Sequence, residues 1–295
     1  MVLNPEYLRF FLFELCAPAR ITVSLITDTN LIDCHCHILP NLDDGPGSIS
    51  DSIEMALVLS SFGFTEIYCT PHLMKGAYDN RKEQIEKSVL DLKTALDEKG
   101  IAVALHMAAE YYLDEYLLDF FDQPMTMGEN VALIEASPQV QPRFLVESMY
   151  GVIMKKHLLP LIAHPERYVM FDAVLVPERS KGLIADLRRW IGGKEAQAAN
   201  VALQADTDDH IGKLKAMGCL FQGNIGSFAG MYGEQVRNRA IRLLQSGLYD
   251  RLGTDAHRPQ KLAEWLQHGL KVIKQEIGQE GLNKLVSTPV GHLVG

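Results

Sequence analysis

Short apolar runs recur along the chain from residue 31 onward, and longer segments with a helical spacing of apolar residues separate them. Short apolar runs between turn signals are typical of strands that are buried in a parallel sheet. The predicted strands are Leu31–His37, Phe64–Thr70, Val103–Ala109, Val131–Ile134, Leu159–Ala163, Gly218–Gly223 and Tyr249–Thr254.

Helices are predicted between these strands. The segment 50–62 has apolar residues on one side and ends before Gly63, a residue type that favours helix C-termini. In the segment 80–99, Ile85, Val89, Leu92 and Leu96 recur at helical spacing. The predicted helices are Ser50–Phe62, Asn80–Lys99, Arg143–His157, Asp206–Met217, Gly233–Gln245 and Gln260–Ile277.

Strands that alternate with helices pair in parallel through right-handed crossovers, so the pattern predicts an α/β fold. The number of strands favours a closed or nearly closed barrel. An open doubly wound sheet is the alternative, but no G-x-G-x-x-G motif follows the first strand. We expect an N-terminal extension over 1–30, a catalytic barrel over 31–278 and a C-terminal tail over 279–295. Residues 173–205 are expected to be an inserted, basic surface helix, more plausibly solvated than a binding site.

Composition narrows the function classes. The formal charge of −9 argues against a nucleic-acid-binding protein, which needs a basic surface. It also disfavours an anionic substrate unless bound divalent cations supply positive charge at the site. The five cysteines lack disulfide-like spacing, which predicts a reducing, cytoplasmic location. No apolar run is long enough for a transmembrane segment.

Metal-binding side chains gather at the C-terminal ends of the predicted strands, where an α/β barrel builds its active site. In His-x-His and Asp-x-His, alternate residues point to the same side, so both side chains can reach one ion. Mixed imidazole and carboxylate ligands suit Zn, Mn or Fe, and eight ligands exceed the need of one tetrahedral ion. The candidate ligands are His35, His37, His72, Glu110, Glu135, His164, Asp255 and His257.

Several alternatives stay open at this point. Cys34 to His37 could be read as a thiolate zinc knuckle, although no second Cys/His pair lies at finger spacing. Arg167 could bind phosphate oxygens in pairs, or form a salt bridge with Glu166 or Asp172. The pair Asp43-Asp44 before Gly45 could be a turn or could supply one more ligand. A cysteine-dependent phosphatase is disfavoured, because no cysteine is followed by arginine at Cys-x₅-Arg spacing.

Five motifs, taken in order, resemble the polymerase-and-histidinol-phosphatase (PHP) superfamily, over roughly Asp28–Gln275. More narrowly, the chain resembles the CpsB/CapC branch, the bacterial metal-dependent protein-tyrosine phosphatases of capsule and exopolysaccharide synthesis. The motifs are His35-Cys-His37-Ile-Leu-Pro40 with Asp43-Asp44-Gly45, Thr70-Pro71-His72, Ala109-Glu110-Tyr111, Ala163-His164-Pro165-Glu166-Arg167 and Thr254-Asp255-Ala-His257.

The resemblance implies a distorted (β/α)₇ barrel of the PHP type that binds three divalent ions, most plausibly Mn²⁺, with Fe or Zn as alternatives. One implied ion has the ligands His35, His37, Glu110 and Asp255. A second shares Glu110 and takes Glu135 and His164. A third takes His72, His257 and either Asp43 or Asp44.

The implied activity is dephosphorylation of protein phosphotyrosine through a metal-activated hydroxide, with Arg167 holding the phosphate. The expected partner is a bacterial tyrosine kinase of polysaccharide export, and the prediction allows a homo-oligomer. The alternatives are a phosphatase for a small monoester such as histidinol phosphate, and a non-catalytic, metal-stabilised module.

Three features depart from the family pattern: the N-terminal extension, the insertion over 173–205, and Gly223, where a larger side chain is usual. Arg258 directly follows His257, whereas the family places a basic residue nearer Lys261. Which of the two faces the site, and binds substrate, is left open.

Overall fold

The computed structural model describes residues 30–172 and 209–288 as a mixed α/β fold with two parallel sheets. Three predicted segments lie wholly or partly outside the described residues. They are the N-terminal extension (residues 1–29), the insertion (173–205) and the C-terminal tail (289–295). One sheet has the strand order β1-β2-β4, and the other has the order β3-β5-β6-β7-β8-β9. The strands are β1 (Leu31–Cys36), β2 (Phe64–Cys69), β3 (His72–Leu73), β4 (Ala104–Met107), β5 (Glu110–Tyr112), β6 (Val131–Glu135), β7 (Leu159–Ala163), β8 (Leu220–Asn224) and β9 (Arg251–Gly253).

A strand lies within or over each predicted apolar run, whereas the short strands β3 and β5 were not predicted. Each follows a longer strand after a brief interruption. Pro71 separates β2 from β3, and it has no N–H to donate to a ladder. β3 and β5 are short and lie directly after longer strands, so neither forms a separate apolar run in the sequence.

Backbone hydrogen bonds connect the two sheets at both sides. Between β2 and β3, the carbonyl of Cys69 accepts from Ala108 N at 3.0 Å, and that of Pro71 accepts from Glu110 N at 3.1 Å. Beyond β9, Asp255 N donates to the carbonyl of His35 at 2.7 Å, and His37 N donates to Ala256 O at 3.0 Å. The first and last strands therefore meet at the residues that the sequence marks as candidate ligands.

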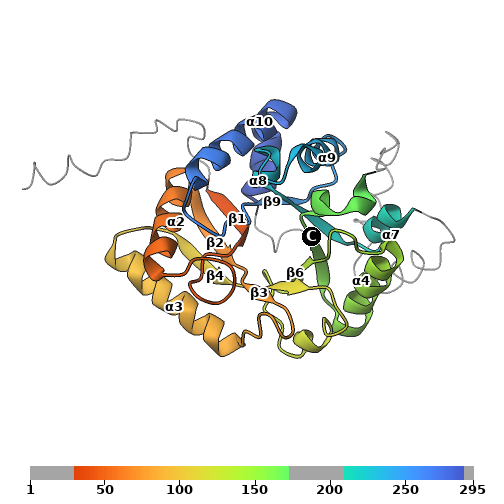
Figure 1. Cartoon of the computed structure of the whole chain (residues 1–295), viewed down its shortest axis with the longest axis horizontal. Helices are drawn as coiled ribbons and strands as arrows, with labels where there is room; N and C mark the ends of the chain where they lie inside the picture. The colour runs from red at the N-terminus through yellow and green to blue at the C-terminus, as the bar shows by residue number, and fades with distance from the viewer. Residues whose placement is uncertain (1–29, 173–208, 289–295) are drawn as a thin grey trace, which may run out of the picture.

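Helices lie around the outside of the strands, as Figure 1 shows. Ser48 caps the N-terminus of the first of them by accepting a hydrogen bond from Asp51 N. The helices are α2 (Ile49–Ser61), α3 (Lys82–Glu98), α4 (Pro142–Lys156), α7 (His210–Ala216), α8 (Ile225–Phe228), α9 (Glu234–Gln245) and α10 (Leu262–Val286). Three short 3₁₀ turns are η1 (Asp119–Asp122), η2 (Pro165–Arg167) and η3 (Val169–Phe171). All six predicted helices correspond to one of these elements.

Helix α10 extends further than predicted. The backbone leaves the helical conformation at Gly278, with φ 74° and ψ 175°, one residue after the predicted end. A second helical stretch then runs to Val286, and its residues Leu282 and Val286 are buried in the main core. The proposed division of the chain at residues 30 and 278 stays a prediction.

Two hydrophobic clusters hold the described residues together. The larger packs the helices against the sheets. The smaller gathers side chains from β1, β6, β7 and β8 together with two residues outside the strands, Ala108 and Met127. Its strand residues are Cys34, Val131, Leu133, Leu161, Ala163 and Leu220. Strand β1 is buried along its whole length, as expected of a parallel strand covered on both faces. Within 30–172 and 209–288, every helix is too short or too polar to span a bilayer.

Gly223 on β8 lies against the ring of Tyr249. A Cβ at this position would lie 2.7 Å from the ring of Tyr249. That ring is buried, and its hydroxyl donates to Glu166 Oε2 at 3.0 Å. The tyrosine therefore fills the space that a larger residue at position 223 would occupy.

Candidate metal centre

The ends of β1, β5 and β9 bring four buried candidate ligands to one point. His35 Nε2 and His37 Nε2 lie 3.1 Å apart, and each is 3.2 Å from Glu110 Oε2. Asp255 Oδ1 lies 3.2 Å from the first imidazole nitrogen and 3.4 Å from the second. Ligand atoms about 2.1 Å from a tetrahedral ion are about 3.4 Å from one another. The spacing of these four atoms matches the first ligand set that the resemblance implied.

The zinc-knuckle alternative is wrong. The Cys34 thiol donates to the carbonyl of Leu252 at 3.5 Å, and the Cys36 thiol donates to that of Ala256 at 3.7 Å. Burial raises the pKa of both thiols, which disfavours the thiolate that a metal needs. Alternation along β1 thus sends the histidines to the ligand cluster and the cysteines elsewhere, and among the described residues no candidate metal group contains a cysteine.

Glu110 lies between this group and a second one. Its Oε2 is 3.1 Å from His72 Nδ1, and its Oε1 is 3.3 Å from His164 Nε2. Glu135 faces both histidines, at 3.7 Å from Nδ1 of His72 and 3.6 Å from Nε2 of His164. The geometry therefore suits a carboxylate that bridges two cations.

A third group distinguishes between the two acids of the Asp43-Asp44 pair. Asp44 Oδ1 lies 3.3 Å from His257 Nε2 and 3.5 Å from His72 Nε2. Asp43 has a different role: its carboxylate accepts from His37 Nδ1 at 2.7 Å and from the backbone N of His72 at 2.9 Å. Asp44 is thus the better-placed candidate ligand of the pair, and Asp43 supports the His37 ring.

The cluster fits divalent cations. Among the described residues, neither carboxylate oxygen of buried Glu110 has a hydrogen-bond partner. Nδ1 of buried His164 has none there either. A buried carboxylate without donors is costly unless positive charge compensates it. Cations held by the surrounding imidazoles and carboxylates would supply that charge.

The pKa values in the metal-free protein agree with this reading. Burial alone would lower the pKa of His35, but Glu110 and Asp255 raise it to about 9. Burial and the charge of Glu110 raise the pKa of Glu135 to about 7. The raised pKa values favour protons at positions that a cation could take, so metal binding should release protons.

We expect Mn²⁺ to raise the melting temperature of the metal-free protein, because it binds the folded cluster and not the unfolded chain. Metal at 100 times its dissociation constant adds roughly 2.7 kcal/mol to the free energy of unfolding. Thermal melts with chelator and with Mn²⁺ measure the shift. Glu110→Gln removes the central negative charge and should reduce the shift. Identical melting curves of the wild type with and without Mn²⁺ would show that the folded cluster binds no metal.

Arg167 lies at the edge of the cluster, on η2. Its Nη1 atom is 3.6 Å from Asp255 Oδ2, and its guanidinium stacks over the ring of Tyr232 at 4.8 Å from the centroid. Its side chain is 31% exposed, so an anionic ligand can reach it.

The salt-bridge alternative for Arg167 is wrong, because both proposed partners are engaged elsewhere. Glu166 is buried and accepts from Ser227 Oγ at 2.7 Å and from Tyr249 OH at 3.0 Å. Asp172 pairs with Arg239, whose Nε donates at 2.8 Å. Arg167 instead pairs with Asp255, and its role in binding phosphate stays a prediction.

Two candidate ligands adopt a backbone conformation that L residues rarely take. The φ angle is 32° for His164 and 53° for Asp255. Such conformations cost on the order of 1–3 kcal/mol and persist only where surrounding structure imposes them, often at functional sites.

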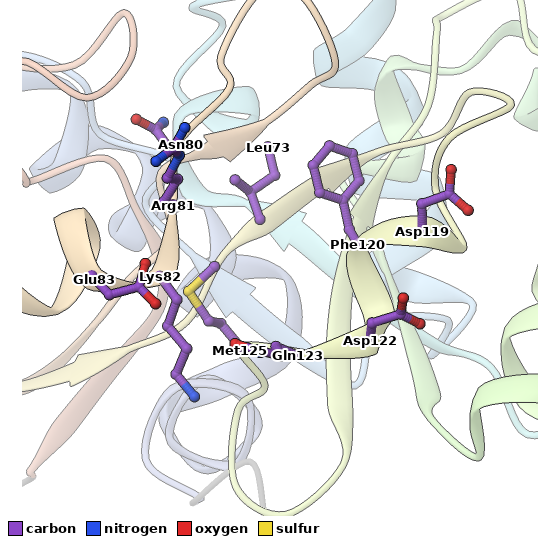
Figure 2. Close-up of a pocket in the computed structure, with 10 residues that line it drawn as sticks. All are labelled: Leu73, Asn80, Arg81, Lys82, Glu83, Asp119, Phe120, Asp122, Gln123 and Met125. Carbon is purple, nitrogen blue, oxygen red and sulfur yellow. The ribbon is translucent and has the colours of Figure 1, made fainter.

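Two surface pockets of the described residues are separate from the cluster, since no candidate ligand lines either one. The first, of about 330 Å³, has Asn80–Glu83 on one side and Asp119 and Asp122 on the other, with Leu73 and Phe120 between them (Figure 2). The second includes exposed Arg258 beside Pro46 and Asp51. Arg258 thus lines this second pocket, and its role in substrate binding stays a prediction.

Sequence reasoning missed the side chains that hold the ligands from behind. They are Gln222 and Asn224 on β8, which contact His35 and Asp255, and Tyr232, which contacts Arg167. A signal existed for the first two. Both lie at the end of the predicted strand Gly218–Gly223. It is the only one of the seven predicted strands whose C-terminal end was given no candidate ligand.

The comparisons with known proteins agree with the motifs. Residues 31–178 and 202–294 match the family described as "Capsular polysaccharide synthesis, CpsB/CapC". Tyrosine-protein phosphatase YwqE of Bacillus subtilis is 26% identical over 85% of this chain and 86% of its own length. Putative tyrosine-protein phosphatase CapC of Staphylococcus aureus is 24% identical over 77% of both chains.

A solved structure gives the same result. It comes from work on YwqE from Bacillus subtilis and CpsB from Streptococcus pneumoniae, described as metal-dependent tyrosine phosphatases. The TM-score is 0.66 at 26% identity, and the match covers 86% of this chain and 91% of the other. The family match spans most of the chain and includes every candidate ligand, so the protein belongs to the CpsB/CapC family.

Proposed function

We propose that this protein is a metal-dependent phosphatase that hydrolyses phosphotyrosine in proteins that control capsular or exopolysaccharide synthesis. The observation that carries the proposal is the convergence of imidazole and carboxylate atoms around Glu110, whose buried oxygens need a cation. Membership of a family whose relatives are named tyrosine-protein phosphatases supports the substrate class.

We infer three cation sites, which the groups of candidate ligand atoms support. His35, His37, Glu110 and Asp255 hold the first ion. Glu110, Glu135 and His164 hold the second ion. His72 lies between the second and the third site. His72, His257 and Asp44 hold the third. Manganese is the proposed metal, because carboxylates add a preference for harder ions.

The chain's own residues orient the reaction. Bound divalent ions supply water activation at neutral pH and neutralise the charge of the transferring phosphoryl group. Arg167 binds two phosphate oxygens through its planar guanidinium and stabilises the negative charge that builds on them. Tyr232 supports the guanidinium from one side, while Asp255 Oδ2 attracts it from another.

The wider setting is part of the same proposal. The two parallel sheets form one distorted (β/α)₇ barrel of the PHP type. The backbone bonds from Asp255, beyond β9, to His35 on β1 and from Ala108, between β4 and β5, to Cys69 on β2 support this proposal. The enzyme acts in the cytoplasm on a tyrosine kinase of polysaccharide export, as a monomer or a homo-oligomer. The catalytic unit spans residues 31–278.

A panel of substrates tests the proposal. Protein reconstituted with Mn²⁺ is given a phosphotyrosine peptide, a phosphoserine peptide and histidinol phosphate, and released phosphate is measured. We expect the highest kcat/KM with the phosphotyrosine peptide. Preference for histidinol phosphate would replace the substrate class but keep the metal chemistry. Metal binding without hydrolysis of any of the three would favour a non-catalytic module.

A further inference from the structure

The end of β8 carries two polar side chains, Gln222 and Asn224, that are fully buried behind the ligand cluster. They alternate along the strand and thus point to the same side of the sheet. Gln222 Oε1 lies 2.9 Å from His35 Nδ1, and Asn224 Nδ2 lies 2.6 Å from Asp255 Oδ2. A third contact, of 2.9 Å between Gln222 Nε2 and Asn224 Oδ1, joins the two.

One backbone carbonyl group determines the direction of all three hydrogen bonds in the series His35–Gln222–Asn224–Asp255. Gln222 Nε2 lies 2.7 Å from the carbonyl oxygen of Gly223, which can only accept. The atom at this position must therefore be the amide nitrogen, and it also donates to Asn224 Oδ1. The other amide atom of Gln222 must be the oxygen, so His35 Nδ1 must carry a proton. Asn224 then donates through Nδ2 to the carboxylate of Asp255.

This polarity has a consequence at each end. A neutral imidazole with a proton on Nδ1 has its lone pair on Nε2, the atom that faces His37, Glu110 and Asp255. At the other end, Asn224 occupies Oδ2 of Asp255, while Oδ1 faces His35 and His37. This series of hydrogen bonds thus presents His35 Nε2 and Asp255 Oδ1 to the first cation site as free acceptor atoms.

Gly253 makes the arrangement sterically feasible. A Cβ at this position would lie 2.7 Å from His35 Cβ and 3.2 Å from Gln222 Nε2. A glycine on β9 therefore allows the His35 ring and the Gln222 amide to approach each other behind the site.

We propose that Gln222 and Asn224 are positioning residues that fix the tautomer of His35 and the rotation of Asp255, and so set the affinity of the first cation site. The inference rests on the proposed metal sites. Its test is metal binding, which is measured without any substrate, so failure here is distinguishable from failure of the proposed phosphatase activity.

The experiment compares Gln222→Met and Asn224→Leu, which keep side-chain size but remove the hydrogen bonds, by titration of the metal-free full chain with Mn²⁺. Outer partners of metal ligands typically change affinity by about 10–100-fold. We expect the binding step that His35→Ala abolishes to weaken by that factor in both variants. The other steps should change little, and excess Mn²⁺ should restore kcat.

Gln245→Met is the matched control, because this glutamine is exposed on α9 and its side chain donates to Glu276 on α10. Circular dichroism and thermal melting of the metal-free proteins verify folding. If one of the two variants does not fold, the other still tests one end of the chain of hydrogen bonds. Folded variants that bind Mn²⁺ with wild-type affinity, even with lowered melting temperatures, would overturn the proposal and leave the two residues a structural role.

Discussion

Replacing His35 with alanine is expected to remove bound metal and to lower kcat/KM by at least about 1,000-fold. His35 Nε2 lies within 3.2 Å of three other candidate ligand atoms, so its loss opens the first cation site on one side. A factor of 1,000 corresponds to about 4 kcal/mol of transition-state stabilisation, within the range that a catalytic metal supplies. Metal content and kcat/KM on a phosphotyrosine peptide are the measurements.

His106→Ala is the control for this variant. His106 is half-exposed on β4 and pairs with Glu66 at 2.8 Å, away from the ligand cluster. The His106→Ala variant should keep the metal content and the activity of the wild type. Chelation of the wild type should reproduce the effect of His35→Ala, and added Mn²⁺ should reverse it. Full activity in thoroughly demetallated wild-type protein would end the metal-dependent reading.

Arg167→Lys is expected to lower kcat/KM by roughly 10–1,000-fold, equivalent to about 1.4–4 kcal/mol. Lysine keeps the positive charge but loses the planar pair of donors that matches two phosphate oxygens. It also loses the flat surface that stacks on Tyr232. Metal content should stay at the wild-type level, because a guanidinium is no metal ligand, and this separates Arg167 from His35.

Arg143→Lys controls for the chemistry of the substitution. This arginine lies exposed on α4 and pairs with Glu147 at 2.8 Å, so its replacement should leave kinetics unaltered. Kinetics, metal stoichiometry and melting temperature are compared across the three proteins. A stable, fully metallated Arg167→Lys enzyme with wild-type kcat/KM would remove Arg167 from the site.

The sequence predicted seven of the nine strands in the described residues, because each of the seven is a run of apolar residues between turn signals, and such runs are local. It also predicted that His35 and His37 face the same way, since side chains alternate along a strand. Their Nε2 atoms lie 3.1 Å apart. Position at strand ends was enough to bring all eight candidate ligands together, because parallel strands end at one face. The helix break after Ile277 is likewise local, since it occurs at a glycine.

Other features required the tertiary structure. Asp43 and Asp44 are adjacent in sequence, and only the path of their loop directs Asp44 to His257 while Asp43 supports His37. Arg167 was left between a phosphate and two carboxylates, because a sequence does not show that Ser227, Tyr249 and Arg239 already occupy those carboxylates.

The supporting hydrogen bonds are the clearest case of the difference. Gln222 contacts a residue 187 positions away, and Asn224 contacts one 31 positions away. Local pattern determined which residues lie on one side of each strand, because that depends only on backbone geometry. Which side chains from different strands then touch depends on strand register and on close approach at Gly253, and these are set by packing of the whole domain.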